Sequence, residues 1–342
     1  MEGPQEDAQT DFMTPPRKSK KCFSKSIVTD MPLDLIEDWC NKTKRCKGKG
    51  YLKGYTPWLN NEFLVPTHRF DGKQWISWEV HKEQVSQDSV GSLSFYTQNI
   101  WFGEKNMKER YANLIQMICE SNADFIWLQE VVIPFFEMIL ENQHIVNNYY
   151  ISGNTINDYG LLMLSKWPVY FYEFPFENSW MNRSLLLAET MFNGKTFLVW
   201  TSHLESLDNR LKRSKQIDYI QNTILKGYDA IFMGDFNFDF KWPDEYVSVD
   251  WDTYQDLWRT LKDSKDEDYT MNGTSRFRPA ALDHIIISKN SQFVPDFIQR
   301  VGNYCWRNFD GDSIHEIRED DIVRTPSDHL GLYAVWKCLN LN

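Results

Sequence analysis

Five short polar motifs each stand at the edge of a hydrophobic segment, and their residue types suit chemistry on a phosphate. They are Gln98-Asn99, Gln129-Glu130, Ser202-His203, Gly234-Asp235-Phe236-Asn237 and Ser327-Asp328-His329. In the fourth motif, a carboxylate and an amide two residues apart can hold and activate a water molecule. Alone it is weak evidence, because Gly-Asp-x-Asn is also an ordinary turn at a strand end. The recurrence of such motifs over residues 98–329 predicts one shared site.

Each motif offers a separable chemical role. The carboxylate of Glu130 follows an apolar run and could bind a hard cation through oxygen. Asn99 could bond to Glu130, to the cation or to a phosphate oxygen, or it could form an Asx turn. His203 and His329 could donate to a phosphoryl oxygen or protonate a leaving group, with Asp283 fixing the tautomer of His329. A hydrogen-bonded structural role stays open for each histidine.

Other residues offer secondary contacts. Asp328, next to His329, could support the metal or its water. His284 follows Asp283 on an expected strand, so it should face the opposite side and be structural. Candidate substrate contacts, with surface ion pairing or ordinary packing as the alternatives, are Arg183, Arg276, Arg278, Trp101 and Phe277.

Alternating strands and helices must position these residues from about residue 91 onward. Period-two and apolar patterns predict strands over 93–99, 124–129, 148–153, 159–165, 168–175, 184–191, 197–201, 230–234, 282–288, 292–297 and 330–336. Helices are predicted over 107–120, 134–140 and 208–225. Many strands with few helices indicate an α/β fold, a four-layered α/β sandwich of two packed mixed β-sheets flanked by helices.

The chain divides into three zones by composition. Residues 1–54 are basic and polar and are expected to be largely disordered, apart from a short helix over 31–40. They include a candidate phosphorylation site at Thr14 beside a basic stretch that could be an import signal, with a solvated charged tail as the alternative. Residues 55–90 are expected to form a small aromatic-rich extension, and residues 91–342 a larger domain that holds the five polar motifs.

Net charge and cysteine content restrict the ligands that the protein can bind and the environment in which it works. The net charge is −11, with 48 Asp and Glu against 37 Lys and Arg, which argues against direct phosphate binding unless acidic groups hold a divalent cation. Six cysteines without a CxxC pair, and an amino terminus without a signal-peptide pattern, favour reduced thiols inside a cell. No apolar run approaches the roughly 20 residues that span a bilayer.

Taken together, these segments resemble the endonuclease/exonuclease/phosphatase superfamily over roughly residues 91–338, and within it the 5′-tyrosyl-DNA phosphodiesterase branch. The motifs that carry the resemblance are 98–102 (QNIWF), 128–131 (LQEV), 178–183 (NSWMNR), 201–206 (TSHLES), 234–237 (GDFN), 269–270 (YT) and 326–331 (PSDHLG). The HLES stretch is specific to this branch.

The resemblance implies a DNA repair enzyme that uses Mg²⁺, with Mn²⁺ as an alternative. It would cut the phosphotyrosyl bond between a trapped topoisomerase and a DNA 5′ end and leave a 5′-phosphate. A single-stranded end and a monomeric enzyme are expected. The implied roles place Glu130 on the metal with Asp328 beside it, and give Asp235 and Asn237 the attacking water. His203 and His329 would then stabilise the transition state.

Several alternatives stay open. An abasic-site endonuclease, a 3′-exonuclease or deadenylase, an RNA–protein unlinking enzyme, and a phosphoinositide or sphingomyelin phosphatase would use the same core. A non-catalytic binding module is a further alternative. Met271 stands where the branch has an aromatic residue, and His284 stands where it has arginine, so both departures are expected to bear on substrate contacts. Residues 1–90 do not match the branch's ubiquitin-binding domain.

Overall fold

The computed structural model describes residues 63–87, 90–154, 156–224, 228–262, 265, 267–273, 277–303 and 325–338. The helix expected over 31–40 and the disorder expected over 1–54 lie outside these residues. The strands are β1 (Leu64–Val65), β2 (Thr67–Phe70), β3 (Trp75–Trp78), β4 (Ser86–Gln87), β5 (Ser92–Asn99), β6 (Phe125–Val131), β7 (Tyr150–Ser152), β8 (Gly160–Ser165), β9 (Tyr170–Pro175), β10 (Ser184–Phe192), β11 (Lys195–His203), β12 (Asp229–Asp235), β13 (Tyr254–Asp256), β14 (Asp283–Ser288), β15 (Phe293–Val301) and β16 (Gly331–Cys338). The helices are α2 (Lys82–Val85), α3 (Met107–Ser121), α4 (Ile133–Glu141), α5 (Gln143–Asn148), α6 (Arg210–Tyr219), α7 (Pro243–Tyr246) and α8 (Leu257–Leu261), with a π-helical turn at Ile220–Ile224.

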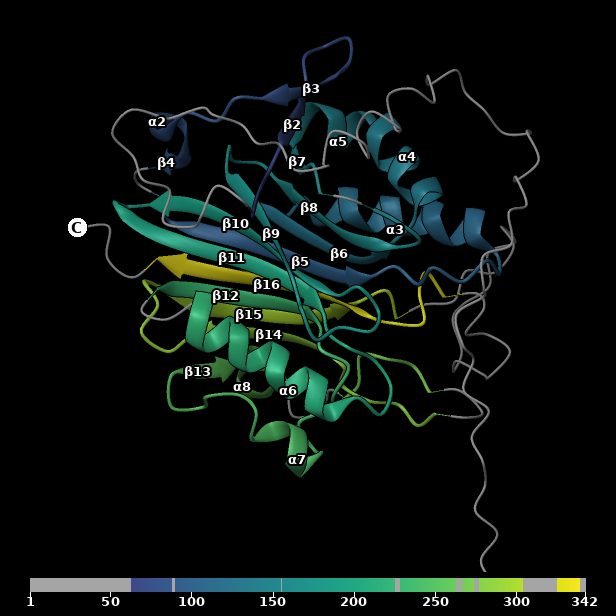
Figure 1. Ribbon diagram of the computed structural model, residues 1–342. Helices are drawn as coiled ribbons and strands as arrows, with labels where there is room; N and C mark the ends of the chain where they lie inside the picture. Colours follow the sequence, from purple (N-terminus) through teal and green to yellow (C-terminus); the bar gives the residue numbers. More distant parts are fainter. Residues whose placement is uncertain are drawn as a thin grey trace, which may run out of the picture.

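Two mixed sheets lie face to face between layers of helices (Figure 1). One sheet has the strand order β1-β9-β10-β11-β12-β14-β13, with β4 pairing to β10. The other has the order β15-β16-β5-β6-β8-β7-β2-β3. The neighbours β5 and β6 are parallel, as are β11 and β12. The predicted four-layered α/β sandwich is confirmed.

Alternation along the strands separates the inner core from the two helical layers. In β6, Phe125 and Trp127 pack into the core between the sheets, whereas Ile126 and Leu128 pack outward against α3, α4 and α5. On the other sheet, Trp200 points outward and packs with Ile217 of α6. Because successive strand residues face opposite sides, nearly continuous apolar strands such as these are buried on both faces.

The strands between residues 64 and 87 join the two sheets. β1 pairs with β9 and β4 pairs with β10 in one sheet, whereas β2 and β3 extend the other sheet from β7. The domain boundaries expected near residues 54 and 90 stay predictions.

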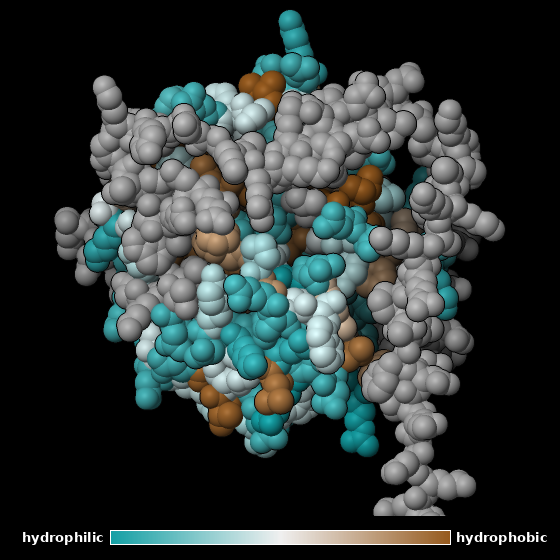
Figure 2. Space-filling view, viewed as in Figure 1, coloured by the Kyte–Doolittle hydropathy of each residue, from teal (hydrophilic) through white to brown (hydrophobic). Residues whose placement is uncertain are grey.

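Most expected elements of the catalytic region have a counterpart, and the differences are local. The helix expected over 208–225 begins at Arg210, and its α-helical part ends at Tyr219 before the π-helical turn. The short helix α5 was not expected; the side chain of Asn142 caps it by accepting from the backbone of His144 and Ile145. Among the described residues, no helix is long and apolar enough to cross a membrane. The coloured surface in Figure 2 is mainly hydrophilic, with separate small apolar patches.

Candidate active site

The strand register brings the polar motifs to one edge of the two sheets. Asn99 and Gln129 are partners at the carboxyl ends of the parallel strands β5 and β6. His203 and Asp235 are partners at the carboxyl ends of β11 and β12, and Asp283 opens the antiparallel neighbour β14 opposite Asp235. The segment before β16 arrives at the same edge, because β16 runs antiparallel to β5. Residues far apart in sequence therefore meet above the inner core.

Asp235 lies at the centre of this cluster. Its Oδ2 accepts a hydrogen bond from Asn99 Nδ2 at 2.9 Å, and its Oδ1 accepts from the backbone N–H of Asn237 at 2.9 Å. His203 Nε2 and His329 Nε2 lie 3.4 and 3.9 Å from the same Oδ2. Burial raises the pKa of Asp235 to about 6, with the nearby imidazole of His329 opposing the rise. A carboxylate with this pKa is suited to accept a proton near neutral pH.

The two histidines differ in charge, and His329 is the positively charged one. Burial lowers the pKa of His329, but the carboxylates of Asp283 and Asp235 outweigh it, so the pKa lies well above its usual value. His329 Nδ1 is 2.7 Å from Asp283 Oδ2, which also accepts from Thr270 Oγ1 at 2.7 Å. His329 is therefore an imidazolium whose Nε2 faces Asp235.

His203, by contrast, is neutral. Burial, together with the positive charge of Arg183, lowers the pKa of His203 well below its usual value. Arg183 Nη1 lies 2.7 Å from His203 Nδ1. Since a guanidinium only donates, Nδ1 must accept and Nε2 must carry the proton. The Nε2–H of His203 is thus a hydrogen-bond donor aimed at the centre of the site.

Glu130 is placed by a β-bulge. The β6–β8 register runs from Leu128 opposite Leu162 to Val131 opposite Gly160, which leaves an extra residue on β6. Glu130 has a φ of 58°, a left-handed conformation that non-glycine residues rarely adopt. Its Oε2 accepts a hydrogen bond from the backbone N–H of Phe102 at 3.1 Å. The bulge redirects this carboxylate toward the site.

The acidic groups around Glu130 fit a divalent cation. Burial, followed by the negative charge of Asp328, raises the pKa of Glu130 to about 7. Burial also raises the pKa of Asp328. Two half-buried carboxylates that repel each other supply the oxygen ligands that a hard divalent ion prefers, and such an ion would remove the repulsion.

A second group, Asp235, Asp283 and His329, also offers ligand atoms within 4.8 Å of one another. There, however, Asp283 Oδ2 and His329 Nδ1 already share a hydrogen bond. The Glu130 and Asp328 pair is therefore the better candidate for the metal.

A buried arginine that was not predicted from the sequence connects the segment after β5 with the segment before β16. Arg110 of α3 is fully buried and donates to the carbonyl oxygens of Ile100, Trp101 and Pro326. Its guanidinium lies 4.3 Å from the centre of the Trp101 ring, so Trp101 packs on Arg110. The available signal was a charged residue on the apolar face of a helix, four positions before the core residue Leu114.

The segment 178–183 is anchored by Glu205, whose role was also not foreseen. Glu205 is fully buried; its Oε2 accepts from Ser179 Oγ and its Oε1 from the backbone N–H of Trp180, both at 2.8 Å. Ser179 Oγ in turn accepts from the backbone N–H of Arg183 at 2.8 Å. The HLES stretch thus holds the segment that places Arg183 against His203.

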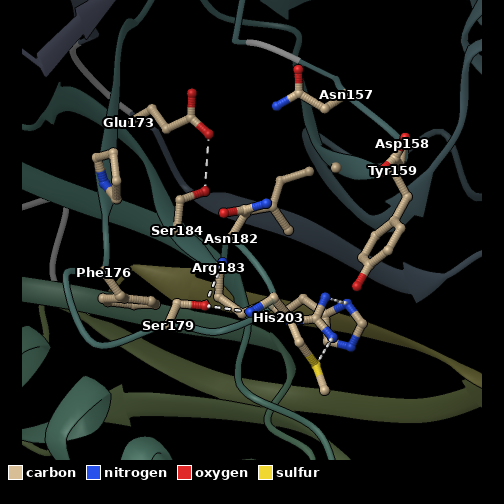
Figure 3. A pocket seen from close by; sticks show the side chains of 14 residues that line it. Asn157, Asp158, Tyr159, Glu173, Phe176, Ser179, Asn182, Arg183, Ser184 and His203 are labelled. Carbon is tan, nitrogen blue, oxygen red and sulfur yellow. Dashed lines mark hydrogen bonds between the residues drawn. The ribbon is translucent and has the colours of Figure 1, made fainter. Parts of the chain in front are cut away.

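A pocket of about 450 Å³ opens beside His203 (Figure 3). Its wall includes Tyr159, whose ring lies 5.2 Å below the Arg183 guanidinium and stacks on Phe102 at 5.1 Å. Phe102 is 46% exposed, so an aromatic surface borders the site at a position that was not predicted.

The remaining predicted residues lie on other segments. Phe277 is 58% exposed and Arg278 is exposed, whereas Arg276 lies outside the described residues. This segment reaches the site through Met271, which forms isolated bridges with Ala280 and His329.

His284 faces away from the catalytic groups. His284 Nδ1 lies 3.1 Å from Asp256 Oδ2, and its Nε2 lies 2.9 Å from the carbonyl oxygen of Phe238. His284 and Asp283 therefore have different partners, as expected for neighbouring residues on opposite faces of a strand. Asp256 and Phe238 hold the imidazole of His284 in a buried, structural position. The expectation that the change from arginine at this position bears on substrate contacts stays a prediction.

Comparison with known proteins gives consistent matches. The family model described as "Endonuclease/Exonuclease/phosphatase family" matches residues 96–329. The chain is similar to tyrosyl-DNA phosphodiesterase 2 of Xenopus laevis, at 27% identity over 72% of this chain and 67% of the relative. It is similar to the mouse protein of the same name, at 26% identity over 72% of this chain and 66% of the relative. The chain thus spans about two thirds of the length of these relatives.

Solved structures share the fold. The crystal structure of D. rerio TDP2 complexed with single-strand DNA product matches with a TM-score of 0.57 and 22% identity, over 72% of this chain and 99% of that one. The matched family model covers more than half of the chain and includes every motif residue from Asn99 to His329. The protein therefore belongs to the endonuclease/exonuclease/phosphatase family.

Proposed function

We propose that this protein is a Mg²⁺-dependent 5′-tyrosyl-DNA phosphodiesterase, which hydrolyses the bond between a trapped topoisomerase peptide and a DNA 5′ end. The observation that carries the reaction is the set of groups around Asp235. A carboxylate with a raised pKa lies within 4 Å of one neutral and one charged imidazole. The substrate is supported by the similarity to proteins named tyrosyl-DNA phosphodiesterase 2.

Asp235 is the base for the attacking water. Asn99 Nδ2 and the Asn237 N–H each bind one of its two oxygens, which fixes the plane of the carboxylate. A water bound to Asp235 gives up a proton to it as the new O–P bond forms. Asn237 adopts a φ of 55°, so the chain turns sharply after β12 and leaves Asp235 at the mouth of the site.

The two imidazoles act on the phosphoryl group. The Nε2–H of His203 and the Nε2–H of the His329 imidazolium converge on the space next to Asp235. Both donate to oxygens on which negative charge grows as phosphorus becomes five-coordinate. The cationic His329 needs Asp283, and the neutral His203 needs Arg183 as the donor to its Nδ1.

Glu130 and Asp328 are the residues that would hold the metal ion. When bound there, the ion would supply a Lewis acid that neutralises charge on the phosphate. The departing tyrosine oxygen belongs to a phenol with a pKa of about 10, so it leaves the phosphorus more readily than a sugar hydroxyl does. Arg183 and Tyr159 lie beside His203 in a position to receive this ring.

The deciding experiment compares matched oligonucleotides in the presence of Mg²⁺. They carry a 5′-phosphotyrosine, a 3′-phosphotyrosine, an abasic site or a 3′ poly(A) tail. Release of tyrosine and a 5′-phosphate from the first substrate alone is the expected result. Faster turnover of any other substrate would refute the proposal. Omission of the metal, and replacement by Mn²⁺ or Ca²⁺, tests the identity of the ion.

Three further parts of the proposal need their own tests. We propose that the enzyme is a monomer, that it acts on single-stranded ends and that it works in the nucleus or cytoplasm. The similarity to a structure bound to single-strand DNA product supports the second point. Sedimentation analysis, competition with duplex ends and imaging of the tagged protein test these points in turn.

A further inference from the structure

Arg110 is fully buried and holds two segments of the candidate active site in place. Its guanidinium donates to the carbonyl oxygen of Pro326 and to several carbonyl oxygens of the segment 100–105, which follows β5. The N–H groups of an arginine form a planar fork, so one side chain can fix carbonyl groups from two segments relative to each other. Because Arg110 is 0% exposed, it cannot touch a substrate itself. Any effect that it has on the reaction must pass through the residues that it holds.

The segment 100–105 positions the carboxylate of Glu130. The backbone N–H of Phe102 donates to Glu130 Oε2 at 3.1 Å. Trp101, in the same segment, has a φ of 57°, and Glu130 has a φ of 58°. Left-handed conformations of this kind cost energy and persist only where the surrounding contacts hold them. Arg110 supplies such contacts, since both of its Nη atoms lie 3.2 Å from the carbonyl oxygen of Trp101.

The contact with Pro326 extends the same support to the other candidate metal ligand. Arg110 Nη1 donates to the carbonyl oxygen of Pro326 at 3.3 Å, two residues before Asp328. Ser327, which lies between them, donates from its Oγ to the carbonyl oxygen of Asn99 at 2.7 Å. The segment that carries Asp328 is therefore fastened both to Arg110 and to the end of β5. One side chain thus supports the segments of both candidate metal ligands.

The positive charge of Arg110 has a separate effect on the site. Burial lowers the pKa of Arg110, and the negative charges of Asp328 and Glu130 are among the interactions that oppose the lowering. This attraction offsets part of the repulsion between the two carboxylates. A resident cation near the site, however, repels a metal ion and weakens its binding. The hydrogen bonds of Arg110 and its charge should therefore act on metal affinity in opposite directions.

We propose that Arg110 is a positioning residue that increases the affinity of the site for its divalent cation by holding Glu130 and Asp328 in place. The inference rests on the proposed function, because it takes these two residues as the metal ligands. The hydrogen bonds dominate over the charge. Carbonyl dipoles that point at the guanidinium offset part of its charge, whereas loss of the fork would release two segments at once.

The test measures metal affinity on the full chain without DNA, so the readout does not depend on catalysis. Electron paramagnetic resonance of free Mn²⁺ gives the Kd for Mn²⁺, and competition gives the Kd for Mg²⁺. Arg110→Lys keeps the charge but loses the planar fork. We expect it to raise both Kd values about tenfold, the lower end of the range of about 10- to 100-fold that is typical for residues orienting metal ligands. Arg110→Met, which also removes the charge, should likewise raise both values.

Arg213→Lys is the matched control, because Arg213 is also a buried arginine. It pairs with Glu245 and donates to the carbonyl oxygen of Glu205. These partners belong neither to the segment 100–105 nor to the segment that begins at Pro326. The control should therefore keep the Kd for Mn²⁺ within about twofold of wild type, as expected for a distant and independent site.

Gly103→Ala tests the same connection if the Arg110 variants do not fold. A Cβ on Gly103 would lie 2.6 Å from Trp101 Cε2, so the segment must shift while the buried arginine is kept. We expect a smaller rise in the Kd for Mn²⁺, of about threefold, because the fork is still present. Circular dichroism on heating shows which variants are folded.

The outcomes separate this inference from the function on which it rests. An unchanged Kd in folded Arg110→Lys, or an equal rise in Arg213→Lys, overturns the role of Arg110 and leaves the proposed function intact. Tighter metal binding by Arg110→Met overturns it as well, because the charge would then dominate. If the Arg110 variants do not fold, an unchanged Kd in Gly103→Ala overturns it. Failure of the wild type to cleave a tyrosyl substrate refutes the proposed function, whereas the metal affinities still decide the role of Arg110.

Discussion

Replacing Asp283 by asparagine should slow the reaction while leaving the fold intact. Asp283 is 2% exposed, and its Oδ2 lies 2.7 Å from His329 Nδ1. Two unit charges roughly 4 Å apart attract by about 4 kcal/mol at an effective dielectric constant of about 20. If the transition state depends on a charged His329, losing this attraction corresponds to a rate loss of up to about 10³-fold.

The assay is the single-turnover cleavage rate on a 5′-phosphotyrosyl oligonucleotide with saturating Mg²⁺. Thr270→Val is the control: it removes the other side-chain donor to Asp283 Oδ2 and the acceptor for the backbone N–H groups of Leu282 and Asp283, but it keeps the charge on Asp283. We expect a loss of about tenfold for this control, in line with one hydrogen bond to a charged group. Asp283→Asn within fivefold of wild type, or equal to Thr270→Val, would show that the charge on His329 is not required.

Three further predictions follow from burial and backbone geometry. Glu130→Gln should raise the Mg²⁺ concentration needed for half-maximal activity at least tenfold, measured by metal titration of the rate; an unchanged requirement would place the ion elsewhere. Burial lowers the pKa of His284 but hydrogen bonding to Asp256 outweighs it and raises the pKa, so the folded state holds a proton that the unfolded state loses above about pH 6.5. Stability in urea should therefore fall as pH rises through the raised pKa, and Asp256→Asn should make that slope shallower, while the raised pKa of His329 leaves part of it; an unchanged slope in Asp256→Asn would contradict the assignment. Gly234→Ala should destabilise by about 2 kcal/mol or more in the same assay, because its φ is 148° and a Cβ would lie 2.3 Å from the carbonyl oxygen of Ser202; a stable variant would contradict this packing.

The fold class was predictable because strand and helix periodicity is local. The pattern over 93–99 and 124–129 anticipates β5 and β6, and both strands follow the alternation of their side chains between two cores. Short elements such as α5 and α8 were not foreseen, since six and five residues carry too little periodicity. Helix α6 was expected to run farther, because periodicity does not distinguish its α-helical part from the π-helical turn that follows.

Some residues of the candidate site could be predicted from their type, whereas others act only through contacts with distant segments. The types of Asn99, Asp235 and His329 indicate phosphate chemistry, and the structure brings their side chains together at one edge of the sheets. Arg110 and Glu205 were not foreseen, because each acts through contacts with backbone atoms or side chains of other segments. Such pairings leave no repeating pattern in the sequence.

The sequence by itself determined the reaction class, because carboxylate, amide and imidazole groups at the ends of apolar strands restrict what the site can do. Only the tertiary structure decided the charge on each imidazole. His203 is neutral and His329 is charged because one faces Arg183 and the other faces Asp283, although both are buried histidines. The physical reason is that a pKa depends on burial and on the charges within a few ångströms, and those neighbours come from strands that only the folded chain brings together.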